Sequence, residues 1–134
     1  MRVPTSLILF TLAWSWFAAP ALAQGPKSVE CQLDGTQLDM NQCANQRWMT
    51  ADAEMNRLYT EQMAHLDAIH KKRLYASQHA WLGYRDLVCQ YEAGRREESG
   101  SIWPATDALC RESLTKQRSQ ILQKYVECRS DGCP

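Results

Sequence analysis

The sequence predicts an all-α fold, namely an antiparallel bundle of three helices stapled by disulfide bonds. Three observations support this prediction. Apolar side chains recur at helical spacing along three long segments of the 134-residue chain. No proline lies inside those segments, whereas loop-forming residues gather between them. The chain also has six cysteines, and an even number in a small chain is typical of a disulfide framework.

Residues 1–23 have the pattern of a signal peptide. The basic start Met1-Arg2 precedes an apolar run over residues 7–19, and Ala21-Leu22-Ala23 has the small-x-small pattern that signal peptidase recognises. An uncleaved anchor is the alternative, but the run is short for a membrane span. We therefore expect residues 24–134 to be one helical domain, periplasmic or secreted, with no membrane attachment after cleavage.

The expected mature chain is close to neutral. Its 111 residues hold 14 basic and 15 acidic side chains, which gives no overall field to attract nucleic acid or an anionic membrane. The charge is nevertheless uneven, since residues 24–70 carry a net −4 and residues 71–134 about +3. A solvated surface is one explanation, and an acidic face that meets a cationic partner is the other.

The first two helices are predicted from their caps. Thr36 and Asp39 mark the start of the first helix, and Asp67 marks the start of a second near Ala68. Because the connection is so short, the two helices must run antiparallel, whereas a single rod through residue 92 would leave its apolar side uncovered. The apolar side of the first helix is traced through Met40, Cys43, Ala44, Trp48, Ala51, Met55, Leu58, Tyr59, Gln62 and Leu66.

An aromatic stripe on the second helix is expected to form the core. Its residues follow one another at steps of four, three, four and three, the spacing of one helical face. They are Ser77, Trp81, Tyr84, Val88 and Tyr91, with Ala80 and Leu87 beside them. So much aromatic surface is expected to be covered by the other helices. Arg85 and Asp86, beside the stripe, are expected to join a partly buried polar network near Asn56.

Residues 94–104 are predicted to form a loop, followed by a third helix. The segment has two glycines, a proline and no apolar periodicity. Pro104 suits the first position of a helix, which we expect to continue to Cys128. The positions that continue it with helical spacing are Leu109, Leu114, Arg118, Ile121 or Leu122, and Tyr125.

Helix geometry restricts the pairing of the cysteines. At ~1.5 Å per residue, Cys43 and Cys89 both lie about 35 Å from the turn at Leu66. Cys110 belongs to the same end of the bundle, whereas Cys128 is roughly 27 Å away along the third helix. A disulfide needs Cα atoms within about 7 Å of each other, so Cys128 cannot reach the other end. The preferred bridges are Cys31–Cys43, Cys89–Cys110 and Cys128–Cys133, and exchanged pairings among the first four cysteines stay open.

No catalytic, cofactor-binding or metal-binding arrangement stands out. The histidines are His65, His70 and His79, and we interpret them as solvated because none forms an i, i+4 pair with a carboxylate. Asp52 and Glu54 lie two apart and face different sides of a helix. No nucleophile motif or phosphate loop occurs either. We expect a protein that is not an enzyme and has no cofactor; metal binding by the histidines is an alternative hypothesis.

The loop is the candidate partner-binding site. It is polar and is held at both ends by predicted helices and a preferred disulfide. A rigid loop that presents charges, hydroxyls and an aromatic side chain suits insertion into a cleft. The candidate residues are Arg95, Arg96, Glu97, Glu98, Ser99, Ser101 and Trp103. A solvated loop without a partner is the alternative.

Four motifs run in order through nearly the whole expected mature chain. They are Thr36-x-x-x-Met40-Asn41-x-Cys43-Ala44, Ala51-Asp52-x-Glu54-x-Asn56-x-x-Tyr59, Gln78-x-Ala80-Trp81-x-x-Tyr84-Arg85-Asp86-x-x-Cys89, and Ser99-Gly100-Ser101-Ile102 followed by Cys110. Together they resemble the LprI-like lysozyme-inhibitor N-terminal domain family. The chain departs from that family's pattern in two respects. Cys128 and Cys133 look like additions, and the family's Gly-Gly-Ser-Ile loop begins here with serine.

The resemblance implies a small exported bacterial protein whose partner is a protein such as lysozyme or another cell-wall hydrolase. In that case the acidic first helix would attract the cationic enzyme. Arg95, Arg96 or the loop hydroxyls would enter a cleft whose carboxylates act on glycans. The alternative function is a periplasmic structural or adaptor domain that binds another envelope protein and leaves lysozyme unaffected.

We predict that Cys128 pairs with Cys133, because every other cysteine lies out of reach at the far end of the bundle. Peptide mapping under non-reducing conditions checks this. A linked peptide that joins Cys128 to any of the other four cysteines would contradict the predicted helix layout.

Overall fold

The structure is a computed structural model that describes residue 31 and residues 33–128. Its elements are α1 (Gln37–His65), α2 (Ala68–Ala93), the 3-10 helix η1 (Gly100–Ile102) and α3 (Trp103–Glu127). No strand occurs in the described part of the chain, so the predicted all-α class is confirmed. The expected signal peptide and Cys133 lie outside the described residues.

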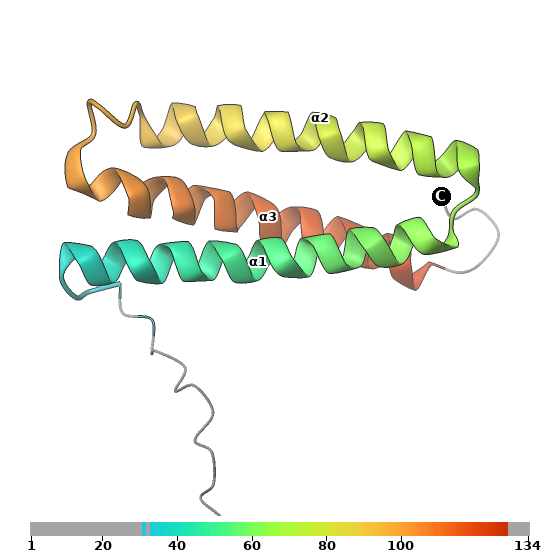
Figure 1. The fold of residues 1–134 in the computed structure, drawn as a ribbon, viewed down its shortest axis with the longest axis horizontal. Coiled ribbons are helices and arrows are strands. Elements are labelled where there is room, and N and C mark those ends of the chain that lie inside the picture. The colour runs from blue at the N-terminus through green and yellow to red at the C-terminus, as the bar shows by residue number, and fades with distance from the viewer. Residues whose placement is uncertain (1–30, 32, 129–134) are drawn as a thin grey trace, which may run out of the picture.

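The three helices form an elongated antiparallel bundle (Figure 1). α3 packs closely along α1 and makes fewer contacts with α2, which lies on the outer side of α3. A short turn joins α1 to α2 at one end, and the loop that carries η1 joins α2 to α3 at the other. The long α2–α3 loop therefore lies at the same end as the beginning of α1.

The helix starts follow from the predicted caps. At α1, the Thr36 hydroxyl accepts a hydrogen bond from the Asp39 amide, and the Asp39 carboxylate accepts one from the Thr36 amide. At α2, the Asp67 carboxylate accepts bonds from the amides of Ile69 and His70. These bonds satisfy amides that have no partner inside the helix. The starts of α1 and α2 were thus readable from the sequence.

The apolar interior consists of two clusters at opposite ends of the bundle. The larger one, near the α1–α2 turn, contains Met55, Leu58, Leu74, Leu122 and Val126. The smaller one, near the loop, contains Ala44, Ala105 and Ala108, with Trp48 and Leu109 packed against it. Short alanine side chains let α1 and α3 approach closely at that end. The part of the interior between the clusters is polar.

The predicted burial of the aromatic stripe is wrong. Tyr84, Leu87 and Tyr91 are 56%, 69% and 89% exposed, and Trp81 and Val88 are half-buried. The residues of α2 that are buried are Leu74, Gln78, Arg85, Cys89 and Ala93. Both sets have helical spacing, so periodicity could not decide between the two faces. The more polar face turns inward because it meets polar partners on α1 and α3.

Two buried arginines fill the space between α2 and α3. The guanidinium groups of Arg85 and Arg118 lie 5.4 Å and 6.0 Å from the ring centroid of Trp81. Arg118 also donates hydrogen bonds to Gln78 on α2 at 2.9 Å and to Ser77 at 3.2 Å. Burial lowers the pKa of Arg118 below its ordinary value. α2 is therefore held by charged and polar side chains as well as by apolar contacts.

A buried carboxylate, that of Glu112, joins α1 to α3. The carboxylate of Glu112 lies 2.9 Å from the guanidinium of Arg47 on α1 and 2.6 Å from the ammonium of Lys116. Burial by itself raises the pKa of Glu112, but the hydrogen bonds from Lys116 and Arg47 outweigh it and leave the pKa below its ordinary value. The ionised form is therefore favoured in the folded protein.

We predict that Glu112→Gln lowers the free energy of unfolding at pH 7 by about 1–3 kcal/mol, because the charge-assisted bonds are lost. Since the folded-state pKa is depressed, this stabilisation is present above the ordinary value of 4.5 and disappears as the pH falls through the folded-state pKa. Denaturant titrations from pH 3 to 8 should show the two proteins converging at low pH. The exposed control Glu92→Gln should change stability by less than about 0.5 kcal/mol, and a pH-independent deficit in Glu112→Gln would contradict the assignment.

Candidate functional site

The α2–α3 loop is built by its own backbone. Gly94 ends α2 with a positive φ of 71°, which favours glycine. The carbonyl of Arg95 then accepts hydrogen bonds from the amides of Glu98 and Ser99 at 3.0 Å and 3.1 Å. The Ser99 hydroxyl contacts the carbonyls of Ala93 and Arg95 at 2.9 Å and 3.0 Å. The loop is therefore a hydrogen-bonded turn.

Trp103 closes the loop from its far side. Its indole Nε1 donates a hydrogen bond to the carbonyl of Gly94 at 3.0 Å, and the guanidinium of Arg96 lies 5.7 Å from the ring centroid. The side chain is half-buried. Trp103 thus joins the two ends of the loop and supports Arg96, which places Arg96 at the surface of the loop.

Two further links fix the loop to the bundle. The Asn41 side chain on α1 donates a hydrogen bond to the carbonyl of Ser101 at 3.1 Å. The Cys89–Cys110 disulfide joins the end of α2 to the beginning of α3, with a Cα–Cα distance of 5.6 Å. The preferred pairing of these two cysteines is therefore confirmed. So is that of Cys31 with Cys43, at the start of α1.

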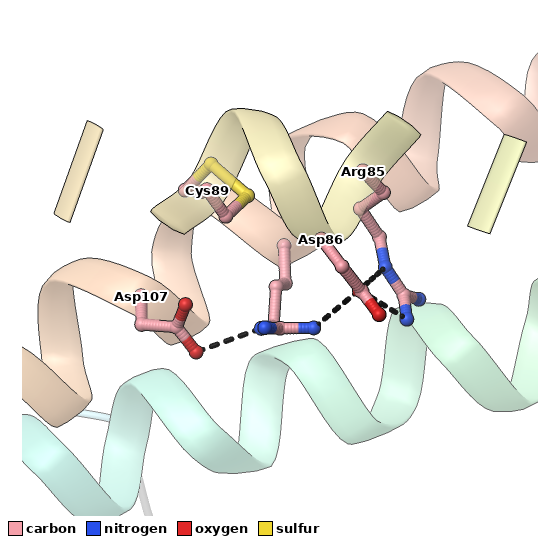
Figure 2. The surroundings of a disulfide bond; sticks show 6 residues. Arg85, Asp86, Cys89 and Asp107 are labelled. Carbon is pink, nitrogen blue, oxygen red and sulfur yellow. Dashed lines mark hydrogen bonds and ion pairs between the residues drawn. A yellow bond between two sulfur atoms is a disulfide. The ribbon is translucent and has the colours of Figure 1, made fainter. Parts of the chain in front are cut away.

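A chain of charges lies beside the Cys89–Cys110 disulfide (Figure 2). Arg111 is 2.7 Å from Asp107 and 2.6 Å from Asp86, and Asp86 is 3.1 Å from Arg85. Arg85 reaches Asp52 on α1 at 3.3 Å. Burial alone would lower the pKa of Arg111, but Asp107 and Asp86 raise it above its ordinary value. This ion network joins all three helices next to the loop.

The network partly matches the one expected from sequence. The partner of Arg85 on α1 is Asp52, and the side chain of Asn56 in turn donates a hydrogen bond to Asp52 at 2.9 Å. Arg111 and Asp107 were not anticipated. They lie four residues apart, a spacing that allows an ion pair on one helix, but nothing in the sequence indicates that Asp86 on α2 would join them.

The loop brings most of its candidate residues to the surface. Those with exposed side chains are Arg95, Arg96, Glu97, Glu98 and Ser101, whereas Ser99 and Trp103 are half-buried and bonded inside the loop. Arg95 is 3.5 Å from Glu98 and 4.0 Å from Glu97. Ile102, which is 45% exposed, was not a candidate. The sequence signal that could have indicated it is its position directly after Gly100 and Ser101 in the loop.

The described residues offer no sign of a metal centre or a membrane span. No group of three or more histidine, cysteine, aspartate or glutamate side chains in this part of the chain is arranged to hold a metal ion. Among the same residues, no helix combines the length and apolarity that crossing a bilayer requires.

The fold and loop define a class of protein: a disulfide-stapled helical bundle that presents one preformed polar loop. Comparison with known sequences identifies the family. Residues 30–122 match the family described as Lysozyme inhibitor LprI, and the chain belongs to that family. It is also 34% identical over 122 residues to an uncharacterized protein of Rhizobium meliloti (strain 1021), a match that covers 81% of this chain and 86% of that protein. No solved structure matches the chain.

We predict that Gly94→Ala destabilises the protein by about 1–3 kcal/mol, because a side chain would force an unfavourable backbone conformation. Its Cβ would also lie 2.8 Å from the Ser99 hydroxyl oxygen. Thermal or denaturant unfolding measures the change. The control is Gly83→Ala in the middle of α2, where a Cβ meets nothing within 4 Å and the folded chain should gain up to about 1 kcal/mol. Equal effects of the two changes would contradict this view of the loop.

Proposed function

We propose that this protein is an exported inhibitor-like protein without enzymatic activity, which binds lysozyme or another cell-wall hydrolase through the α2–α3 loop. Membership of a family described as a lysozyme inhibitor supports a protein partner of this kind. The signal-peptide pattern of residues 1–23 and the Cys31–Cys43 and Cys89–Cys110 disulfides support a periplasmic or secreted location.

The observation that carries the proposal is that the loop is preformed. Its turn, its tryptophan hydrogen bond and its bond to α1 hold it in one conformation before a partner arrives. Binding then costs little further loss of conformational entropy, which is the advantage that rigid inhibitory loops have over flexible ones. The loop also lies at one end of an elongated bundle, where it can enter a concave surface.

Arg96 is the loop residue best suited to contact the enzyme. Its side chain is exposed, and within the described part of the chain its guanidinium has Trp103 as its neighbour but no carboxylate. Arg95, in contrast, is neutralised by Glu97 and Glu98. Glycoside hydrolases of this type act through a pair of carboxyl groups, and an arginine can bind such a group with two parallel hydrogen bonds.

The test is the rate at which lysozyme degrades cell-wall substrate in the presence and absence of the purified protein. We expect inhibition, and we expect Arg96→Glu to raise the inhibition constant at least about tenfold, as loss of an interface hot spot does. The matched control is Arg73→Glu, an exposed arginine near the opposite end of α2, which should inhibit like the unaltered protein. Melting curves establish that both variants are folded.

Two results would count against the proposal. Absence of inhibition at micromolar excess over several lysozyme types would remove the inhibitor function and favour the adaptor alternative. Full inhibition of lysozyme by Arg96→Glu would indicate that the protein contacts the enzyme through a surface other than the loop.

A further inference from the structure

One face of α2 is apolar and uncovered. We call it the outer face of α2, and it consists of the exposed residues Ala76, Ala80, Gly83, Tyr84, Leu87 and Tyr91. They recur at steps of three and four and therefore share one side of the helix. The charged residues of α2 between positions 76 and 91 are Arg85 and Asp86, and both are engaged in the ion network. Figure 1 places α2 at the edge of the bundle, away from α1.

Gly83 lies in the middle of this face, and nothing in the single chain requires a glycine at this position. A Cβ at this position would meet nothing within 4 Å, and its φ is not positive. A glycine inside a helix destabilises it by roughly 0.5–1 kcal/mol relative to alanine. What a glycine does allow is the close approach of another backbone.

The two ends of α2 carry unbalanced charge. Lys71, Lys72 and Arg73 are exposed near its N-terminus, and no ion pair in the described part of the chain involves them. Cations are unfavourable there because a helix N-terminus is already positive. At the other end no basic residue occupies the last turn of α2, so its exposed carbonyl groups are not offset.

Three carboxylates, one in the last turn of α2 and two in the loop, add to the negative character of that end. They belong to Glu92, Glu97 and Glu98, and all three are exposed. The neighbouring Arg95, which binds Glu97 and Glu98, and Arg96 offset two of these three charges, which leaves a net −1. α2 therefore has a cationic end and a weakly anionic end, joined by an apolar face.

We propose that the outer face of α2 binds a second copy of this chain, with the two α2 helices antiparallel and a two-fold axis near Gly83. Antiparallel pairing brings the cationic end of each α2 to the anionic end of the other, at both ends simultaneously. Parallel pairing would place like charges together. The glycines meet at the centre, and Tyr91 of each copy covers Ala76 of the other.

A second copy fits better than an unrelated partner, because both complementary charges belong to the same helix. When two α2 helices pair in antiparallel fashion, the cationic end of each meets the anionic end of the other. The contact is small: the outer face from Ala76 to Tyr91 spans about 23 Å, and one helix face buries less than the roughly 800 Å² per partner of a standard interface. We therefore expect a weak, salt-sensitive dimer. The proposal does not depend on lysozyme binding, and it leaves the two loops at opposite ends of the pair.

Sedimentation equilibrium of protein expressed from the full sequence tests the dimer. Leu87→Glu should raise the dimer dissociation constant at least about tenfold, since a charge replaces a central apolar contact. The matched control is Leu38→Glu, a leucine on α1 that is 63% exposed and off this face, which should dimerise like the unaltered protein. Gly83→Leu is a second disruptive variant, because a Cβ at this exposed position meets nothing within 4 Å in the single chain and leucine favours helix.

The orientation is tested with a nitroxide attached at position 72 through a non-cysteine group. Antiparallel pairing predicts an intermolecular separation of roughly 33 Å along the helix axis, whereas parallel pairing predicts about 10 Å. An unaltered protein that stays monomeric near millimolar concentration would overturn the proposal. Equal dimer dissociation constants for Leu87→Glu and Leu38→Glu would also overturn it. So would a distance of about 10 Å between the two nitroxides, or a monomer whose outer face of α2 binds only anionic vesicles.

Discussion

The arrangement of the three helices depends on the ion network that crosses the bundle from Asp107 through Arg111, Asp86 and Arg85 to Asp52. A buried guanidinium is costly unless carboxylates surround it, because removal of a charge from water has a large free-energy penalty. Each arginine in the network pairs with one acidic side chain on its own helix and one on a neighbouring helix. The pairs Arg85–Asp52 and Arg111–Asp86 link α2 to α1 and to α3, so the network helps to fix where α2 lies.

The loop depends on that placement. The end of α2 and the beginning of α3 are held by the network on one side and by the Cys89–Cys110 disulfide on the other, which leaves the ten or so connecting residues a fixed span. Within that span, the hydrogen bond from Trp103 to Gly94 and the one from Asn41 to Ser101 select one conformation. A loop so constrained has little entropy to lose on binding. The preformed shape of the candidate site is thus a consequence of the polar interior.

Much of the local structure was predictable, because it depends on interactions between residues close in sequence. The caps at Thr36 and Asp67 are satisfied within three residues. Helix lengths placed Cys43, Cys89 and Cys110 at one end of the bundle, whereas the structure decided the pairing among the alternatives that stayed open. The extent of the loop followed from Gly94 and Pro104. The conformation of its side chains did not, and Trp103, expected to project toward a partner, instead lies across the base of the loop.

The buried face of α2 is where sequence reasoning failed. The aromatic stripe and the face that contains Gln78 and Arg85 have equal periodicity, and hydrophobicity favoured the stripe. Hydrophobicity was misleading because it takes no account of the partners that Asp52, Asp86 and Arg118 supply to the polar face. An arginine on a helix is a surface residue by default and becomes an interior one only when hydrogen-bond acceptors or aromatic rings from elsewhere in the fold meet it, as carboxylates do at Arg85 and polar groups do at Arg118.

The sequence by itself therefore determined the helices, their order, their ends and the end of the bundle at which the cysteines gather, since each depends on neighbours along the chain or on helix length. The tertiary structure decided which side of α2 is buried, which arginines are interior and how the loop closes on Trp103. These outcomes depend on charges and rings that are distant in sequence and come into contact only when the three helices pack together.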